Sequence, residues 1–88
     1  MTETDMLSRA RAIRARVEDM TYDELNAWYL EHVGYKPSED DPSLSPTGLC
    51  SMIAGSMFYR ALPDGVDTEG AEAMERRLTA SIELGSVI

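Results

Sequence analysis

The sequence is poor in the residues that build cross-linked or metal-held frameworks. It contains one cysteine, Cys50, and one histidine, His32, among 88 residues. A single cysteine excludes internal disulfides, and one cysteine with one histidine cannot form a closed zinc site without ligands from elsewhere. We therefore expect neither a disulfide scaffold nor a bound metal ion.

Long hydrophobic runs are also missing. No apolar stretch approaches the length of about 18 residues that a membrane-spanning helix needs. The first residues, MTETDMLSRAR, have the pattern of neither a signal peptide nor a lipidation site. We therefore expect a cytoplasmic protein with no membrane partner, and the cytoplasm of an infected host fits equally well.

Signatures of catalysis and of nucleotide binding are absent. The sequence has no GxGxxG motif and no P-loop. No sequence feature pairs Cys50 with His32 as a nucleophile and its base. The carboxylates fall at helix caps or in loops, rather than on apolar faces where burial would raise their pKa for acid catalysis. The sequence thus predicts a protein that is not an enzyme and has no cofactor.

Basic residues are scarce and unevenly placed. Eight lysines and arginines stand against sixteen acidic residues, which gives a net charge of −8. Four of the eight are arginines within the first helical stretch, and only Lys36 and Arg60 occur between Val17 and Glu75. Such a chain repels nucleic acid and acidic membranes and is attracted to basic surfaces. The same charge also favours solubility without any binding role.

The most complete helix signals lie between Met20 and Tyr35. Thr21 and Glu24 have the spacing of a capping box, and a glycine at 34 is placed to end the helix. Because adjacent residues lie about 100° apart around a helix, Trp28 and Tyr29 cannot both point into one core. We expect Trp28 to be buried and Tyr29 to lie at the core margin. His32, in the last turn, would complement the helix dipole or pack at an edge.

Three further helices are predicted from apolar periodicity. The first covers about Glu3 to Asp19, the second about Pro46 to Ala61, and the third starts at Asp67 or Thr68 and ends near Gly85. Their apolar stripes are Met6, Ala10, Ile13, Val17 and Met20; Leu49, Met52, Ile53 and Met57; and Ala71, Met74, Leu78 and Ile82. Small residues in the middle stretch, including Gly55, would let another helix approach closely. Glu72 and Arg76 are spaced for an i, i+4 ion pair.

No strand-like alternation and no internal repeat occurs. The sequence therefore predicts an all-α fold, a compact bundle of about four helices with short connections and one acidic loop, in a single domain, residues 1–88. A chain of this length buries only about 60% of its unfolded surface. The chain could therefore bury further surface in a homodimer or against a partner.

The main loop is predicted between Tyr35 and Ser45. Two prolines, three serines and three consecutive acidic residues exclude a regular element there. The acids at 39 to 41 lack the alternating ligands, the turn glycine and the distal glutamate of a calcium loop. We expect a surface loop that, if it has a function, contacts a basic partner.

In size, charge and compactness, the whole chain resembles the small acidic orphan proteins of phages and mobile elements, among them anti-CRISPR proteins. The resemblance rests on no motif. It implies binding to a protein of a CRISPR effector complex, with no cofactor and no catalysis. The residues expected to contact the partner are acids and two aromatic anchors: Tyr35, Glu39, Asp40, Asp41, Tyr59, Asp64, Asp67, Glu69 and Glu72.

Two alternatives remain at the level of sequence. One is a structural or regulatory homo-oligomer, joined through the apolar seam of the first helix and the small-residue face of the 46–61 helix. The other is a helical bundle that binds a small molecule, since the six methionines could provide adaptable apolar walls.

Overall fold

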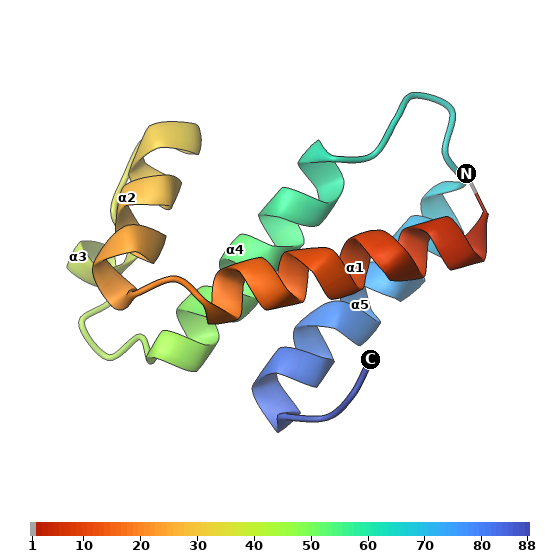
Figure 1. The fold of residues 1–88 in the computed structure, drawn as a ribbon. Helices are drawn as coiled ribbons and strands as arrows, with labels where there is room; N and C mark the ends of the chain where they lie inside the picture. Colours follow the sequence, from red (N-terminus) through yellow and green to blue (C-terminus); the bar gives the residue numbers. More distant parts are fainter. Residues whose placement is uncertain (1) are drawn as a thin grey trace.

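The computed structural model describes residues 2–88, and within that range the chain forms five helices and no strand. The helices are α1 (Glu3–Glu18), α2 (Tyr22–His32), α3 (Pro37–Asp40), α4 (Pro46–Arg60) and α5 (Thr68–Leu84). The all-α prediction is confirmed, and four of the five helices are the predicted ones within one residue or so at each end (Figure 1).

Helix starts follow from local side-chain chemistry. The Thr21 hydroxyl accepts the Glu24 N–H at 3.2 Å, and the Glu24 carboxylate accepts the Thr21 N–H at 3.0 Å, so the predicted capping box is confirmed. Thr2 and Asp5 form the same arrangement at the start of α1. Hydrogen bonds from the capping threonine stabilise each carboxylate, and they hold the pKa of Asp5 and of Glu24 below its ordinary value.

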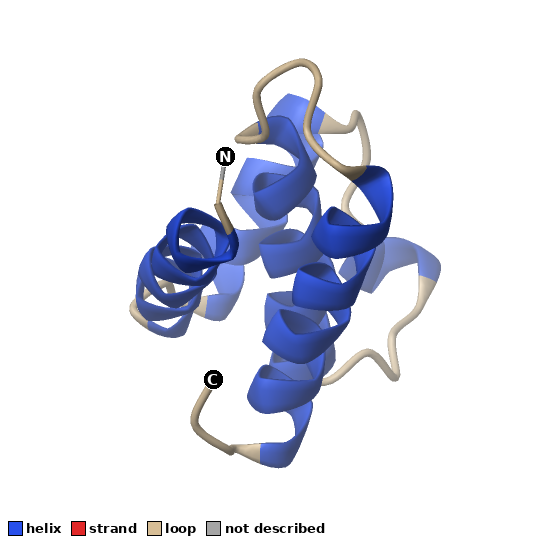
Figure 2. Ribbon diagram, turned by 90° about the vertical axis from the view of Figure 1, so that its right-hand side faces the viewer, coloured by secondary structure: helices blue, strands red, loops and turns tan. Residues whose placement is uncertain are grey.

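Three helices build most of the apolar interior. Helices α4 and α5 are neighbours that run in opposite directions, and α1 crosses this pair (Figure 1). Figure 2 shows α1 nearly along its axis, on one side of the pair. The largest fully buried side chains are Phe58, Leu25, Leu49, Ile53, Leu78 and Val17. All but Leu25 come from α1, α4 and α5, which we call the three-helix core.

The apolar seam of α1 is covered within the chain. Met6, Ala10 and Val17 are buried, and Ile13 and Met20 pack partly buried against them. The small-residue face of α4 is likewise covered, since Ser51, Ala54 and Gly55 are buried. Both surfaces that the homo-oligomer hypothesis would use are therefore occupied inside one protomer.

Gly55 only partly fits its predicted packing role. It is buried at the α4–α5 contact, as expected for a close helix approach. A Cβ placed there would meet Glu75 Oε1 at 2.9 Å, whereas the next side chain, that of Thr79, is at 3.7 Å. The obstacle is the end of a flexible side chain, so the glycine is not demanded by the backbone of α5.

Three of the four arginines of α1 bind main-chain oxygens of this chain. The Arg9 guanidinium donates to the Ala61 carbonyl at 2.8 Å, which completes the end of α4. Arg11 donates to the main-chain oxygen of Ile88 at 3.2 Å. Arg14 donates to the Ser86 carbonyl and also pairs with Glu18. These contacts tie α1 to the end of α4 and to the segment that follows α5.

Residues 21–44 form an arm beside the core, here called the α2–α3 arm. Helix α2 packs on α4 and on α3, at the left of Figure 1, away from α5. Trp28 is 8% exposed and Tyr29 is half-buried, as predicted. The Tyr22 hydroxyl donates to the Leu44 carbonyl at 3.1 Å and joins the two ends of the arm.

The prediction of an irregular loop from Tyr35 to Ser45 was wrong in its first half, where α3 forms one helical turn. Pro37 occupies the first helical position, where its fixed φ suits a helix and its missing N–H costs nothing. Pro37 is also buried, and Asn26 of α2 accepts hydrogen bonds from the Ser38 hydroxyl at 2.8 Å and from its N–H at 3.4 Å. This tertiary support could not be read from the sequence.

Candidate functional site

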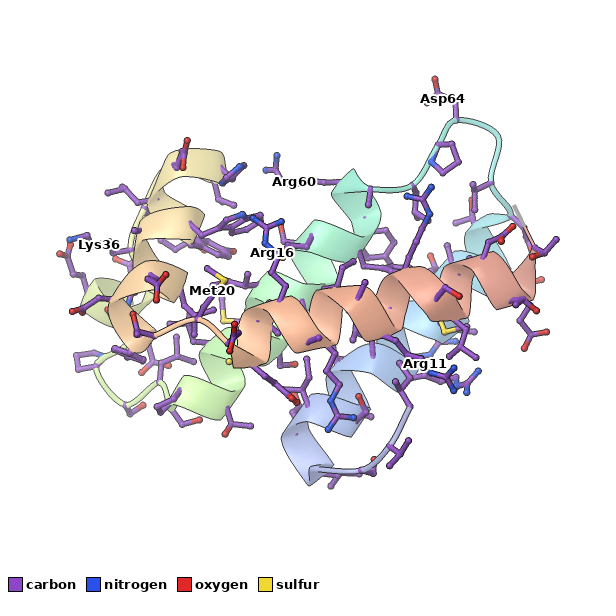
Figure 3. All side chains as sticks on the ribbon, viewed as in Figure 1. Arg11, Arg16, Met20, Lys36, Arg60 and Asp64 are labelled. Atoms are coloured by element: carbon purple, nitrogen blue, oxygen red, sulfur yellow. The ribbon has the colours of Figure 1, made fainter. Side chains whose placement is uncertain are left out.

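The nine residues predicted to contact a partner do not form one surface. Tyr35, Glu39, Asp40 and Asp41 lie around α3, whereas Tyr59, Asp64, Asp67, Glu69 and Glu72 lie on α4, on the α4–α5 connection and on the start of α5. Figure 1 places α3 and the α4–α5 connection at opposite ends of a molecule whose longest extent is 37 Å, and Figure 3 labels Lys36 and Asp64 at these two ends. Tyr59 lies between them, on the last turn of α4, where the next residue, Arg60, donates to the His32 carbonyl of α2. The nine residues therefore lie in separate groups, and their contact with a partner stays a prediction.

The group around α3 is engaged in local contacts. The Tyr35 ring meets the Tyr29 ring edge to face at 5.1 Å, and their hydroxyls lie 3.4 Å apart. This hydrogen bond, together with partial burial, raises the pKa of Tyr29. Lys36 Nζ lies 4.0 Å from Glu39, and Asp41 accepts hydrogen bonds from the N–H and hydroxyl of Ser43. These contacts shape the turn, and Glu39, Asp40 and Asp41 are all exposed on it.

The second group gathers an aromatic side chain among acids. Tyr59 is 46% exposed, and its ring meets that of buried Phe58 edge to face at 6.0 Å. Partial burial and the negative charges of Glu75 and Glu72 raise the pKa of Tyr59, since a phenolate beside two carboxylates is disfavoured. Glu75 was missed by the sequence analysis, although it lies three residues after Glu72 and so on a neighbouring part of the same helix face.

We call this second group the α4–α5 surface. It comprises Tyr59, Asp64, Asp67, Glu69, Glu72 and Glu75, of which all but the half-buried Glu75 are exposed. The predicted ion pair between Glu72 and Arg76 is wrong, because the side chains within residues 2–88 form ion pairs only between Arg14 and Glu18 and between Lys36 and Glu39. The acids of the α4–α5 surface thus keep their charge unpaired by side chains of this protein.

A cavity of about 340 Å³ opens between α1 and α5, next to the α4–α5 surface. Its lining residues are Glu3, Met6, Asp67, Gly70, Ala73, Met74 and Arg77. Met6 and Met74 are buried and form its floor, while the charged residues are exposed. Asp67 has a double role, because it also caps α5 by accepting the Gly70 N–H at 3.2 Å. This cavity was not foreseen, since no pattern along the chain relates Glu3 to Asp67.

His32 has a partner that the sequence analysis did not name. Its ring stacks on Trp28 with centroids 4.3 Å apart, and its Nδ1 lies 2.9 Å from the Trp28 carbonyl oxygen. Arg60 reaches from α4 toward α2 (Figure 3), lies 5.9 Å from the Trp28 ring and donates to the His32 carbonyl at 2.8 Å. The i, i+4 spacing of Trp28 and His32 was the available signal. The cluster holds α2 on α4.

Cys50 lies apart from this cluster. Its Sγ is 3.6 Å from the Val17 carbonyl oxygen, and burial raises the pKa of the thiol. A raised pKa lowers the thiolate fraction and hence the reactivity of a cysteine. Within residues 2–88, no group of three or more histidine, cysteine or acidic side chains is arranged to hold a metal ion.

Comparisons with models of known protein families, with curated proteins and with solved structures give no match for this chain. None of the helices in residues 2–88 combines the length and the apolarity that crossing a membrane requires. The geometry and charge of the chain itself are therefore the basis for assigning a function.

Proposed function

We propose that this protein is a non-enzymatic binding module that attaches to a basic surface of a nucleic-acid-handling protein and inhibits it, in the manner implied by the resemblance to anti-CRISPR proteins. The proposal includes a cytoplasmic location, in which such a partner would be met. One observation supports it most: of sixteen carboxylates, only Glu18 and Glu39 form an ion pair within the described chain, which leaves fourteen unpaired.

The arginines offset this charge only in part. Arg14 pairs with Glu18. The positive charge of Arg76 opposes the effect of Glu75 and Glu72 on the pKa of Tyr59. Arg9, Arg11 and Arg60 donate to main-chain carbonyls, where they bring positive charge to helix ends and to the chain after α5 instead of to surface acids. A surface of one sign steers a partner of the opposite sign and fixes its orientation more than it adds affinity. A basic groove that normally holds nucleic acid is a partner of this kind.

We assign the contact to the α4–α5 surface. It combines unpaired acids with Tyr59, a half-exposed aromatic side chain supported from below by Phe58. Tyrosine is enriched among the residues that dominate binding energy, and a desolvated ring also attracts arginine and lysine. An interface of standard size covers about 800 Å² on each partner. The group around α3 would therefore belong to a separate contact.

The proposal is tested by capture and by charge reversal. The protein is used to capture partners from cells that carry CRISPR effector complexes, and the captured complex is identified by mass spectrometry and then titrated with purified variants. Glu69→Lys with Glu72→Lys should weaken binding at low salt by about tenfold or more, because like charges then face each other.

The matched control reverses two acids of the α3 group, Glu39→Lys with Asp40→Lys, and changes the net charge by the same amount. We expect this variant to retain affinity within about threefold, since its charges lie at the far end of the molecule. If both variants lost the same affinity, the effect would come from net charge and not from the position of the acids. Unchanged affinity of the first variant at low salt would remove the α4–α5 surface from the proposal.

A further inference from the structure

We infer that the cavity between α1 and α5 receives one arginine or lysine side chain of the partner. The head group would lie between Glu3 and Asp67, and the methylene stem would lie on Met6 and Met74. The inference rests on the proposed function and deepens it, because it names the chemical group that the module recognises. The cavity borders the α4–α5 surface through Asp67, so one partner can contact both.

The size of the cavity admits a single side chain or another small ligand and excludes a folded segment. Pockets for drug-sized molecules span about 300–1,000 Å³, and the volume here, about 340 Å³, lies at the lower end. A helix or a strand cannot enter such a space, whereas a single long side chain can. The two helices that border the cavity, α1 and α5, start at the same end of the molecule (Figure 1).

The lining matches the two parts of a basic side chain. Lysine and arginine place a methylene stem on apolar surface and keep their charged head in a polar setting. Met6 and Met74 are 6% and 3% exposed and offer flexible, polarizable atoms for the stem. Glu3 begins α1 and Asp67 caps α5, so both segments that border the cavity contribute a carboxylate to its lining.

Gly70 keeps the space between these parts open. A Cβ at this position would lie 3.0 Å from Asp67 Oδ2 and 3.4 Å from Met6 Cε. It would therefore occupy the space between the Asp67 carboxylate and the Met6 side chain. In the inferred complex, the last methylene of the partner's side chain lies there. The Gly70 N–H binds Asp67 Oδ2, which leaves Oδ1 of the same carboxylate for a second donor.

Arg77 is the one basic residue of the lining. It lies further along α5 than Gly70, whereas Asp67 lies before the start of α5. Arg77 follows Gly70 by seven residues, about 10 Å along α5. Arg77 forms no ion pair with Glu3 or Asp67 in the described chain, so two carboxylates remain for an incoming cation. At its own end of the cavity, Arg77 is placed to donate to a carbonyl of the partner's main chain.

The inference is tested by NMR titration with short capped peptides that carry one central arginine. The signals monitored are the methyl resonances of Met6 and Met74 and the amide resonance of Gly70. The arginine peptide should move these three signals with saturation. The same peptide with citrulline, which keeps the shape and loses the charge, should bind about tenfold more weakly. Equal binding of the citrulline peptide, or binding of a glutamate peptide at the same signals, would overturn the inference.

A double variant, Glu3→Gln with Asp67→Asn, removes the charge while keeping the shapes. Asparagine caps a helix about as well as aspartate, so α5 should remain folded, which its melting temperature checks. The variant should lose the preference for arginine over citrulline, and a retained preference would contradict the inference. Ala73→Phe, at an exposed position of the lining, should block the peptide without changing any charge.

The peptide titration separates this inference from the proposed function. Suppose that the Glu69→Lys, Glu72→Lys variant loses partner binding and the cavity shows no preference for arginine. The proposed function would then be supported, and the inference that the cavity receives a basic side chain would be rejected. If the cavity prefers arginine while the charge-reversal variant binds the partner unchanged, the inference about the cavity would be supported and the assignment of the α4–α5 surface would be rejected.

Discussion

The three-helix core and the α2–α3 arm are built from the same kinds of helices and are held in different ways. In the core, α1, α4 and α5 each bury a continuous apolar stripe against the other two, and three arginines of α1 tie it to neighbouring main chain. The arm contributes two buried apolar side chains from α2, Leu25 and Trp28, and depends on polar contacts at its ends.

The difference concerns local stability. Segments with few buried apolar contacts open at a lower free energy than the whole chain unfolds. We therefore expect the arm to open while the core stays folded. The α4–α5 surface and the α1–α5 cavity belong to the core, so their geometry should persist when the arm opens.

The largest effect should come from the core. Phe58→Ala removes a fully buried ring from α4 and should lower the free energy of unfolding by about 3–5 kcal/mol. Denaturant unfolding followed by circular dichroism measures this. The adjacent Tyr59→Ala is the matched control, and its loss should be much smaller because that ring is half-exposed. Similar losses in both variants would show that Phe58 does not dominate the core.

A smaller and local effect should follow from releasing the arm. Arg60→Ala removes the hydrogen bond to the His32 carbonyl and the cation over Trp28, together worth about 1–2 kcal/mol. Amide hydrogen exchange should accelerate in α2 and remain slow in α5. Arg76→Ala, on the exposed side of α5, serves as the control. Equal acceleration in both helices would mean that arm and core open as one unit.

The two capping boxes allow the same comparison with identical chemistry. Thr21→Ala and Thr2→Ala each remove one helix cap, and each should cost about 1 kcal/mol. Faster amide exchange should stay within α2 for Thr21→Ala, whereas Thr2→Ala should affect α1 and its contacts with α4 and α5. Exchange that spreads to α4 and α5 in the Thr21 variant would contradict the separate opening of the arm.

The smallest effect should appear on acidification. The folded pKa of Asp5 and of Glu24 lies below the ordinary values of 3.8 and 4.5. Their contribution to stability is therefore complete above those ordinary values and is lost as the pH falls through the lowered folded values. Unfolding measured across this acid range should lose part of its pH dependence in Asp5→Asn and in Glu24→Gln. If the pH dependence of unfolding were unaltered in both variants, the capping-box carboxylates would not be the groups that cause it.

The predictable part of the fold was the part encoded within one helical turn. Thr21, Ser45 and Asp67 mark helix starts because each cap accepts the N–H of the residue three positions later. Pro46 adds a signal of its own at the first helical position of α4. The apolar stripes predicted the buried faces of α1 and α5 for the same reason. One turn, α3, was missed because its support comes from Asn26 in another helix.

The candidate site was predictable in its residue types but not in its grouping. The excess of acids and the two exposed tyrosines were visible in the chain. That the acids around α3 lie far from those of the α4–α5 connection, and that Glu75 joins Glu72 beside Tyr59, depends on how the helices pack (Figure 1). A pattern along one chain carries no distance between residues of different helices.

By itself, then, the sequence determined the four long helices, their caps, the buried stripes of α1 and α5 and the sign of the surface charge, because each of these depends on neighbours within a few residues. In α4, Met52 of the predicted stripe is exposed. Only the tertiary structure decided which acids lie together, that the α1 arginines bind carbonyls, that His32 stacks between Trp28 and solvent, and that Glu3 and Asp67 border one cavity. These are contacts between segments up to 77 residues apart, and they exist only after the helices pack.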